Sequence, residues 1–394
     1  MPTYLTPGTY VEGVPRISGA PVEGAATSVA AFVGLAPGGP TDTPVRVTSW
    51  NQFQGTFGDP AQPGNGPFAD GAYLAHAVFG FFANGGQVCW VVRVEDDLVG
   101  DPARRTGLEA LAAVDELTMV CVPDVAVHAQ GDDPYAFERI QGTAIALCEA
   151  AGDRIAILDA APALLPQEVL EWRRDRGGYD SHHAALYWPW ITVVDPLSAR
   201  PLRVPPCGHV AGAWARSDVR RGIHKAPANE VLLGAQDLEY AVTAAEQGAL
   251  NAVGVNCLRA FPARGIRIWG ARTLSSDPEW RYINHRRLVA FVSRSLSDGI
   301  RWATFEPNDP ALWVQLRVAA ASFLTRLWRD GALLGATPEE AFFVRCDETL
   351  NPPEQVEQGQ VIIEVGIALV RPAEFVVFRL AQTGADPSEV AAPW

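Results

Sequence analysis

The chain has 394 residues, enough for two or three domains or for one domain with a large insertion. Its 48% hydrophobic and 19% charged residues are typical of a globular protein. The net charge of −14 disfavours nucleic acid as a partner, because an acidic surface repels phosphate backbones. Lys225 is the only lysine, so arginine carries the positive charge, and arginine is the residue favoured in interfacial ion pairs.

The cysteines and the N-terminus indicate the compartment. Six widely scattered cysteines, most of them within apolar runs, predict buried free thiols rather than disulfides or a zinc site. The first residues contain no basic region followed by an apolar core, and no apolar run approaches membrane-spanning length. We therefore expect a protein that folds in the cytoplasm, with no signal peptide and no direct membrane insertion.

Residues 1–20 are expected to form an arm. Thr9, Tyr10 and Val11 have strand character, but the surrounding prolines and glycines prevent a helix and supply little core. Such a segment is either a frayed terminus or a strand donated to another sheet. Composition alone favours the frayed terminus.

The first compact unit follows the arm. Strands are predicted at 28–35 and 88–94, with a short helix that begins at Ser49 and a second helix at 73–82 between them. Gln52 occupies the capping-box position of the short helix. This order predicts a sheet with helical cover, and the acidic segment 95–101 marks its expected boundary.

In the middle of the chain, apolar strands and helices alternate. Strands are predicted at 117–122, at 154–158 and at 184–194, where Pro189 interrupts the run. Helices are predicted at 136–150, 166–176 and 207–220. This alternation is typical of a parallel α/β sheet, which we expect within residues 100–222.

The last third contains the clearest helix signal, at 309–331. Asp309 can cap this helix, Pro310 suits its first turn, and Gly331 suits a left-handed stop. An apolar stripe recurs at spacings of three and four: Leu312, Leu316, Ala320, Phe323, Leu324 and Leu327. The other side carries Arg317, Arg326 and Arg329, which is either a solvated face or a contact surface. Other segments predict a helix at 280–296 and strands at 341–346, 361–370 and 374–380.

No catalytic constellation is visible in the sequence. Both glycine-rich phosphate loops and the nucleophile-elbow motif are absent. His182 and His183 are neighbours on a predicted strand, so they point to opposite faces and cannot easily share a metal ion. Glu306 is expected to hold Arg286 or Arg287 in a bidentate pair. We therefore predict no enzyme, no metal and no cofactor.

Long segments at both ends resemble the contractile tail sheath family. Near the N-terminus these are TPGTYVEGV, ATSVAAFVGLAPGGP and FFANGGQVCWVVRV. Further along, IRIWGARTLSSDPEWRYINHRRL, FEPNDPALW and RPAEFVVFRLAQ are similar to the same family. The likeness covers residues 1–95 and 222–382 in the family's order. The chain is short, which most resembles the sheaths of R-type bacteriocins and extracellular contractile injection systems.

The resemblance implies an α/β fold with a discontinuous organisation. Residues 21–99 and 223–382 would form an α+β inner sheath domain, and residues 100–222 an inserted α/β domain that faces outward. Residues 1–20 would be an arm that exchanges strands with neighbouring subunits, which replaces the frayed-terminus interpretation. Residues 383–394 extend beyond the last expected strand, and the resemblance assigns them no role.

The function implied is that of a structural subunit. Such subunits stack as six-fold rings around an inner tube, between baseplate and terminal cap proteins, and contract to drive the tube through a target envelope. Assembly would be cytoplasmic, with release as an extracellular particle or virion tail. Two other interpretations remain open: an α/β enzyme whose site lies in the middle domain, and a non-contractile capsid or adhesin subunit. A strongly perturbed titratable cluster at the carboxyl ends of the strands would favour the enzyme.

The resemblance also implies roles for individual residues. The inter-subunit strand arms would contain Thr9, Tyr10, Val11 and Glu12, and Phe375, Val376, Val377 and Phe378. The tube-facing helix would present Arg317, Arg326 and Arg329. A structural motif of the inner domain would comprise Trp269, Gly270, Arg272, Arg286, Arg287, Glu306 and Asn308.

Overall fold

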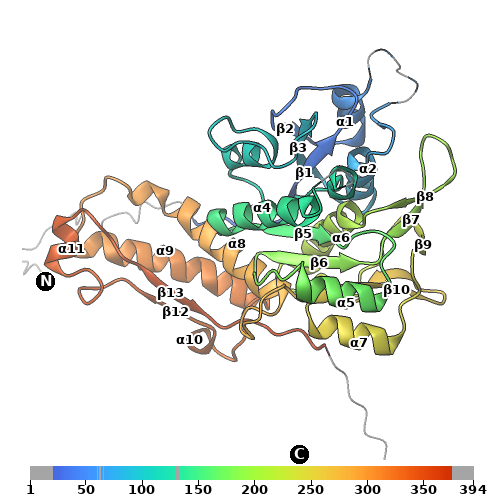
Figure 1. The fold of residues 1–394 in the computed structure, drawn as a ribbon. Coiled ribbons are helices and arrows are strands. Elements are labelled where there is room, and N and C mark those ends of the chain that lie inside the picture. Colours follow the sequence, from blue (N-terminus) through green and yellow to red (C-terminus); the bar gives the residue numbers. More distant parts are fainter. Residues whose placement is uncertain (1–20, 60, 62–63, 65, 130–132, 375–394) are drawn as a thin grey trace, which may run out of the picture.

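The computed structural model describes residues 21–374 with the exception of 60, 62–63, 65 and 130–132. A broad lobe contains a sheet between two layers of helices, and an elongated lobe built from two long helices and a β-hairpin projects from its side (Figure 1). Helices and strands therefore mix as an α/β fold, which confirms the predicted class.

The broad lobe is organised on an eight-stranded sheet with the order β11-β10-β6-β5-β4-β1-β3-β2. The six strands from β10 to β3 run parallel, and β11 and β2 pair antiparallel at the edges. The strands are β1 (Val29–Leu35), β2 (Val45–Val47), β3 (Val88–Val94), β4 (Met119–Cys121), β5 (Ile155–Asp159), β6 (Ala184–Trp188), β10 (Val255–Phe261) and β11 (Gly265–Ile268). The central strands are apolar throughout because helices cover both faces.

Two helical layers provide that cover. One face packs against α1 (Trp50–Phe57), α2 (Leu74–Ala83) and α6 (Cys207–Arg221). The opposite face packs against the 3-10 helix η2 (Gly107–Ala113), α4 (Ala136–Ala151), α5 (Pro166–Asp175) and α7 (Ala244–Ala252), and the short α3 (Val125–His128) lies beside α4. A β-carbon at Gly208 would lie 2.2 Å from the carbonyl oxygen of Ala77, so glycine is required for the close approach of α6 to α2.

A small antiparallel sheet, ordered β8-β7-β9, adjoins the broad lobe. Its strands are β7 (Ile191–Val194), β8 (Pro201–Val204) and β9 (Ala235–Leu238). The run predicted as one strand at 184–194 is divided between β6 and β7, which belong to different sheets. Pro189 lies between them and has no N–H to donate, so the interruption read from the sequence is a change of sheet.

The elongated lobe has its own apolar core. Its elements are α8 (Ile283–Gly299), the 3-10 helix η3 (Arg301–Ala303), α9 (Pro310–Arg329), α10 (Pro338–Ala341), β12 (Phe342–Arg345), α11 (Pro353–Glu357) and β13 (Glu364–Ile367). Leu288 and Val292 of α8 meet Phe323 and Leu324 of α9, and Val22 packs between them. Residues close to the two ends of the described chain therefore contribute to one core.

Helix α9 matches its prediction. The side chain of Asp309 accepts a hydrogen bond from the N–H of Leu312 at 2.8 Å, and Gly331 follows the helix with a φ of +76°. Leu316 and Ala320, in the middle of the predicted stripe, are buried. The 3.6-residue period was sufficient because this helix packs with one face only.

The central sheet crosses the domain boundaries expected at 99–100 and at 222–223. Strand β1 pairs with β3 on one side and with β4 on the other, and β10 pairs with β6. The three expected pieces thus share one sheet, and each expected boundary lies between strands of that sheet. Patterning within each piece cannot reveal parallel pairing, which joins strands that are distant in sequence. The two lobes meet instead where α8 begins, at Ile283.

Candidate assembly site

Arginines of α8 attach the elongated lobe to the broad lobe. Arg287 donates to Asp218 of α6 at 2.9 and 2.5 Å, and both side chains are only 3% exposed. The same guanidinium donates to the carbonyl of Thr27 at 2.9 Å and lies 4.9 Å from the ring centroid of Trp214. This buried bidentate pair therefore joins the first turns of α8 to the last turns of α6.

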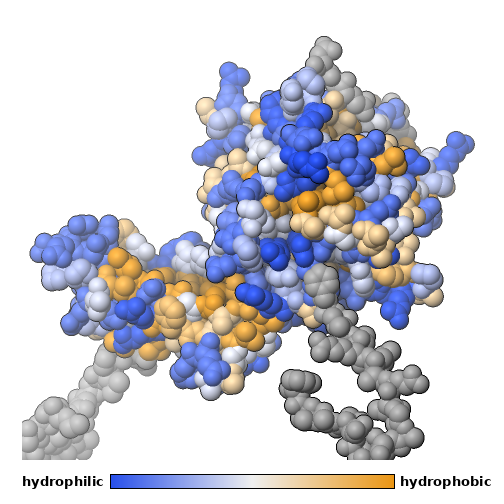
Figure 2. All heavy atoms as spheres, turned by 60° about the horizontal axis from the view of Figure 1, so that its bottom comes forward, coloured by the Kyte–Doolittle hydropathy of each residue, from blue (hydrophilic) through white to orange (hydrophobic). Residues whose placement is uncertain are grey.

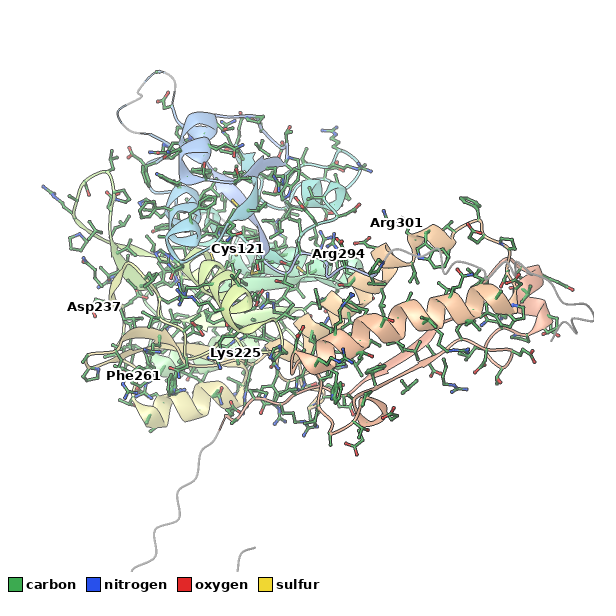
Figure 3. The ribbon with its side chains drawn as sticks, turned by 180° about the vertical axis from the view of Figure 1, so that it is seen from behind. Cys121, Lys225, Asp237, Phe261, Arg294 and Arg301 are labelled. Carbon is green, nitrogen blue, oxygen red and sulfur yellow. The ribbon has the colours of Figure 1, made fainter. Side chains whose placement is uncertain are left out.

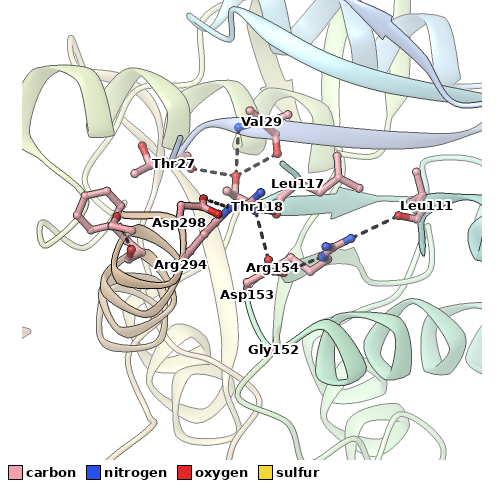
Figure 4. A network of polar contacts seen from close by, with 12 residues as sticks. Thr27, Val29, Leu111, Leu117, Thr118, Gly152, Asp153, Arg154, Arg294 and Asp298 are labelled. Atoms are coloured by element: carbon pink, nitrogen blue, oxygen red, sulfur yellow. Dashed lines mark hydrogen bonds and ion pairs between the residues drawn. The ribbon is translucent and has the colours of Figure 1, made fainter. Parts of the chain in front are cut away.

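A second attachment lies two turns further along α8. Arg294 donates to Asp153 at 3.2 Å, and Asp153 also accepts from Arg154 at 2.9 Å (Figure 4). Figure 3 shows Arg294 at the junction of the lobes, whereas Arg301 lies further out on the elongated lobe. One carboxylate from the loop after α4 thus binds an arginine from each lobe.

The bidentate pair predicted for Glu306 is wrong. Glu306 is exposed beyond the far end of α8, while Arg286 and Arg287 are in the first turns of this 17-residue helix. Arg286 instead donates to the carbonyl of Gly152 and lies over the ring of Trp280. A helix of this length separates its ends by about 25 Å, a distance that no side-chain pair can span.

The other residues of the predicted motif have structural contacts. Asn308 accepts from the indole N–H of Trp313 and donates to the carbonyl of Gln360, both at 2.9 Å. Trp269 packs against Phe261 with ring centroids 4.5 Å apart. Asn308 therefore fixes the segment before α9, and Trp269 packs across the β10–β11 hairpin.

Gly270 and Arg272 both lie against the buried side-chain amide of Asn256. A β-carbon at Gly270 would lie 2.7 Å from the side-chain oxygen of Asn256, and that oxygen accepts from the N–H of Arg272 at 2.7 Å. Glycine is therefore needed at position 270 so that the edge of the sheet can approach Asn256.

Sequence reasoning missed the partner of Arg272, which is Glu374. Arg272 donates to this carboxylate at 3.0 and 2.8 Å, Asn251 at 2.7 Å and Tyr282 at 3.1 Å. These hydrogen bonds hold the pKa of Glu374 below its usual value, although burial opposes them. Glu374 thereby fixes the last described residue of the chain to the broad lobe. Only its position at the start of the strand predicted at 374–380 could have signalled this role.

The hairpin of β12 and β13 is a two-stranded sheet with one apolar face. Val344, Val365 and Ile367 pack toward the core of α8 and α9 but are only half-buried. On the other side Phe343 is 49% exposed over Gly366. Figure 2 shows extensive hydrophobic surface along this lobe. Within the described residues, only the isolated bridge between Leu333 and Leu369 extends the pairing.

The three arginines predicted to face a tube differ in their contacts. Arg317 donates to the carbonyl of Cys346 at 3.0 Å, and Arg326 donates to the carbonyl of Val22. Arg329 is exposed and has no ion pair among the described residues. The outward side of α9 exposes two valines instead, Val314 (46%) and Val318 (41%).

The remaining predicted site residues lie outside the described residues. These are the strand arms, namely Thr9, Tyr10, Val11 and Glu12 in the first arm and Phe375, Val376, Val377 and Phe378 in the second, as well as the tail 383–394. Their roles remain predictions.

Two buried acids at the carboxyl ends of parallel strands reopen the enzyme alternative. Burial raises the pKa of Asp124, after β4, to about 6 and that of Asp159, at the end of β5, to about 7. Asp124 accepts from the N–H groups of Leu35 (2.7 Å) and Tyr73 (2.5 Å), which fixes the end of β1 to the start of α2. The cavity beside Asp159 holds about 10 Å³, room for roughly one water molecule. Asp124 therefore acts as a structural acceptor, and the cavity beside Asp159 leaves no room for a substrate.

Asp159 predicts a pH effect. Its folded pKa of about 7 lies above the ordinary 3.8, so the stability it contributes is present at low pH and is lost as the pH rises through about 7. The free energy of unfolding of Asp159→Asn, compared with that of wild type, should therefore increase by about 2–3 kcal/mol as the pH rises from 5 to 8. Urea unfolding at both pH values measures this gain. Asp180→Asn is the control: hydrogen bonds from Ser276 lower the pKa of Asp180, so its effect should stay constant over this range.

The part of the chain that the structure describes contains no group of three or more side chains placed to hold a metal ion. None of the helices in this part is long and apolar enough to cross a membrane. All six cysteines are buried and free, which confirms the prediction from their spacing.

Comparisons with known proteins agree on one family. Residues 103–274 match the family described as "Phage tail sheath protein central domain", and residues 275–383 match "Phage tail sheath C-terminal domain". A putative prophage major tail sheath protein of Pseudomonas aeruginosa is 26% identical over 60% of each chain, and the tail sheath protein of Vibrio phage KVP40 is 24% identical over 49% of this chain and 28% of its own length. The chain thus spans less than two-thirds of the length of these curated relatives.

Solved structures match over nearly the whole chain. The helical sheath of the anti-feeding prophage in its contracted state is 30% identical, with a TM-score of 0.75, over 97% of this chain and all of the other. The sheath complex of the extracellular contractile injection system PVC, also contracted, is 28% identical with a TM-score of 0.77 over 97% and 99%. The class defined by these matches is structural rather than enzymatic. The chain belongs to the contractile tail sheath family.

Proposed function

We propose that this protein is the subunit of a contractile sheath that polymerises helically around an inner tube and contracts to drive that tube through a target envelope. The observation that carries the proposal is the match over 97% of the chain to two sheaths described in the contracted state. The two matched sheath chains are about as long as this chain. This similarity in chain length favours a sheath of an injection system or a bacteriocin over the sheath of a phage tail. Assembly in six-fold rings, a baseplate and a cap complete the proposal.

Strand exchange would link the subunits. A two-stranded sheet is marginally stable alone, and its free edges accept further strands. The half-buried Val344, Val365 and Ile367 would gain cover if neighbouring subunits added the strands predicted at 9–14 and 374–380. Main-chain bonds of this kind could hold subunits together while each subunit rotates during contraction.

Energy for contraction would be stored in the extended assembly. The sequence contains neither glycine-rich phosphate loop, and no nucleotide is needed if the extended state is metastable and the contracted state has the lower free energy. The subunit would assemble in the cytoplasm and leave the cell within an extracellular particle or virion tail.

Electron microscopy of the protein together with its tube tests this function. We expect striated tubes of two lengths and diameters, the shorter and wider form being empty after treatment with a mild denaturant. Polymers of a single fixed geometry would contradict contraction, and particles without any helical order would contradict the sheath assignment itself.

Helix α9 is our candidate for the tube-facing helix. Because Val314 and Val318 are exposed one turn apart with Arg329 further along, the surface offered to a tube is apolar with a basic end. Val318→Asp combined with Arg329→Glu should reduce co-sedimentation with purified tube at least tenfold and leave the melting temperature unchanged.

Arg317→Ala provides the matched control for that experiment. Its guanidinium binds the carbonyl of Cys346, so its loss should lower the free energy of unfolding by about 1–2 kcal/mol without a direct effect on the tube. If the Val318 and Arg329 variant binds tube normally, α9 does not face the tube.

A further inference from the structure

A basic groove of about 580 Å³ lies between α5, α7 and the segment after β11. Four arginines line it: Arg173, Arg174, Arg272 and Arg281. The one acidic residue of its lining, Asp180, accepts from the hydroxyl and the N–H of Ser276 at 2.5 and 2.8 Å. In a chain of net charge −14, this is a marked local concentration of positive charge.

Most of this positive charge has no carboxylate partner among the described residues. Arg173 donates to backbone carbonyls only, those of Gly177 at 2.6 Å and Tyr179 at 2.7 Å among them. Within the described part of the chain, neither Arg174 nor Arg281 has an acidic group inside ion-pair distance. The groove therefore fits an anionic occupant.

The fourth arginine indicates the occupant. Arg272 already binds Glu374, the last described residue, so the chain leaves the described structure at the wall of the groove. From residue 380 onward the sequence contains Asp386 and Glu389 and no lysine or arginine. Residues 380–394 are thus complementary to the groove in charge, whereas Arg379 directly precedes them.

We propose that the acidic tail, residues 383–394, binds in this groove of its own chain before the subunit assembles. Asp386 and Glu389 pair with Arg174 and Arg281, while Val390 meets the apolar part of the lining, which includes Leu170, Val253 and Leu274. Twelve residues separate Glu374 from Asp386. A flexible chain of that length has a root-mean-square span of about 20 Å, so the groove is within reach.

This contact gives the tail a role that strand exchange does not supply. A terminal strand donated to a neighbour carries residues 383–394 away from the groove, so donation must first release them. The tail then delays donation in the free subunit, and assembly removes it. This role rests on the proposed strand exchange, but the binding of the tail to the groove does not.

Disulfide trapping in the unassembled full-length chain tests the binding. Gly178 is exposed in the groove, and a β-carbon there would have its nearest neighbour 3.8 Å away. Gly178→Cys is combined with Ser388→Cys, and the native cysteines do not compete because all six are buried. Gly55→Cys with Ser388→Cys is the control, since Gly55 is exposed on α1, at the far side of the broad lobe (Figure 1), with nothing within 4 Å of its added β-carbon.

We expect the Gly178 pair to form an intrachain disulfide at least tenfold faster than the Gly55 pair in dilute, mildly oxidising solution. Arg174→Glu with Arg281→Glu should abolish this advantage, and so should 1 M salt, which screens exposed charges within about 3 Å. Equal rates for the two pairs, insensitivity to the charge reversal, or a disulfide that forms only between chains would each overturn the proposal. Failure of the chain to polymerise would bear on the proposed sheath function and leave this result intact.

Discussion

Arg287→Met should lower the free energy of unfolding by about 3–5 kcal/mol, because it leaves the carboxylate of Asp218 buried without its counter-charge. Both side chains are 3% exposed, and the guanidinium also satisfies the carbonyl of Thr27. Urea unfolding followed by tryptophan fluorescence measures the loss, and Trp214 lies beside the substituted side chain. The two lobes of this variant should also unfold less cooperatively.

The double variant separates the charge effect from the loss of packing. Arg287→Met with Asp218→Leu removes both charges, so it should be more stable than Arg287→Met alone. Arg301→Met is the matched control: its pair with Asp298 is 2.7 Å long but its side chain is 76% exposed, and it should cost no more than about 1 kcal/mol. Equal losses at Arg287 and Arg301 would show that burial of the pair has no energetic importance.

The arginines of α8 also bear on how a sheath subunit would transmit force. Arg286 and Arg294 bind the loop after α4, at Gly152 and Asp153, and Arg287 binds Asp218 of α6. Directional contacts at three points along one helix resist both sliding and rotation between the lobes. A subunit joined in this way can turn as one body, so a movement imposed on the hairpin is passed to the broad lobe.

Local signals were read correctly from the sequence where one residue and its near neighbours decide the structure. Helix α9 shows this, since its cap, its stripe and its glycine stop all act within four residues. Helix α7 carried an equally local signal that was missed: Thr243 and Glu246 form a capping box at its start. Helix α7 precedes β10, so the crossover into that strand was not predicted.

Non-local relations could not be read from a single chain. The pairing of β1 with β4 and of β10 with β6 joins strands that are far apart in sequence, so the pattern within one segment could not predict it. The partners of Arg287 and Arg272 lie 69 and 102 residues away, and the residues next to an arginine do not indicate which acid it binds. The same holds for Glu306, which was predicted to pair with Arg286 or Arg287 and lies beyond the far end of their helix.

Deletion of residues 1–14 should abolish polymerisation and leave a folded, soluble monomer. The described core begins at Val22, so the deletion removes none of that core, whereas the free edges of β12 and β13 would lose a donated strand. Sedimentation velocity and electron microscopy should show monomers, with a melting temperature close to that of the full chain.

Val11→Pro is the milder form of this change, because proline removes one N–H from the ladder that the arm would form. It should reduce the amount of polymer at least tenfold with a melting temperature within a few degrees of wild type. Thr3→Pro, outside the predicted strand, should polymerise normally. Tubes of normal length from the deletion would reject strand donation by this arm. Polymer lost equally from Thr3→Pro would show that the effect of proline does not depend on a strand at residues 9–14.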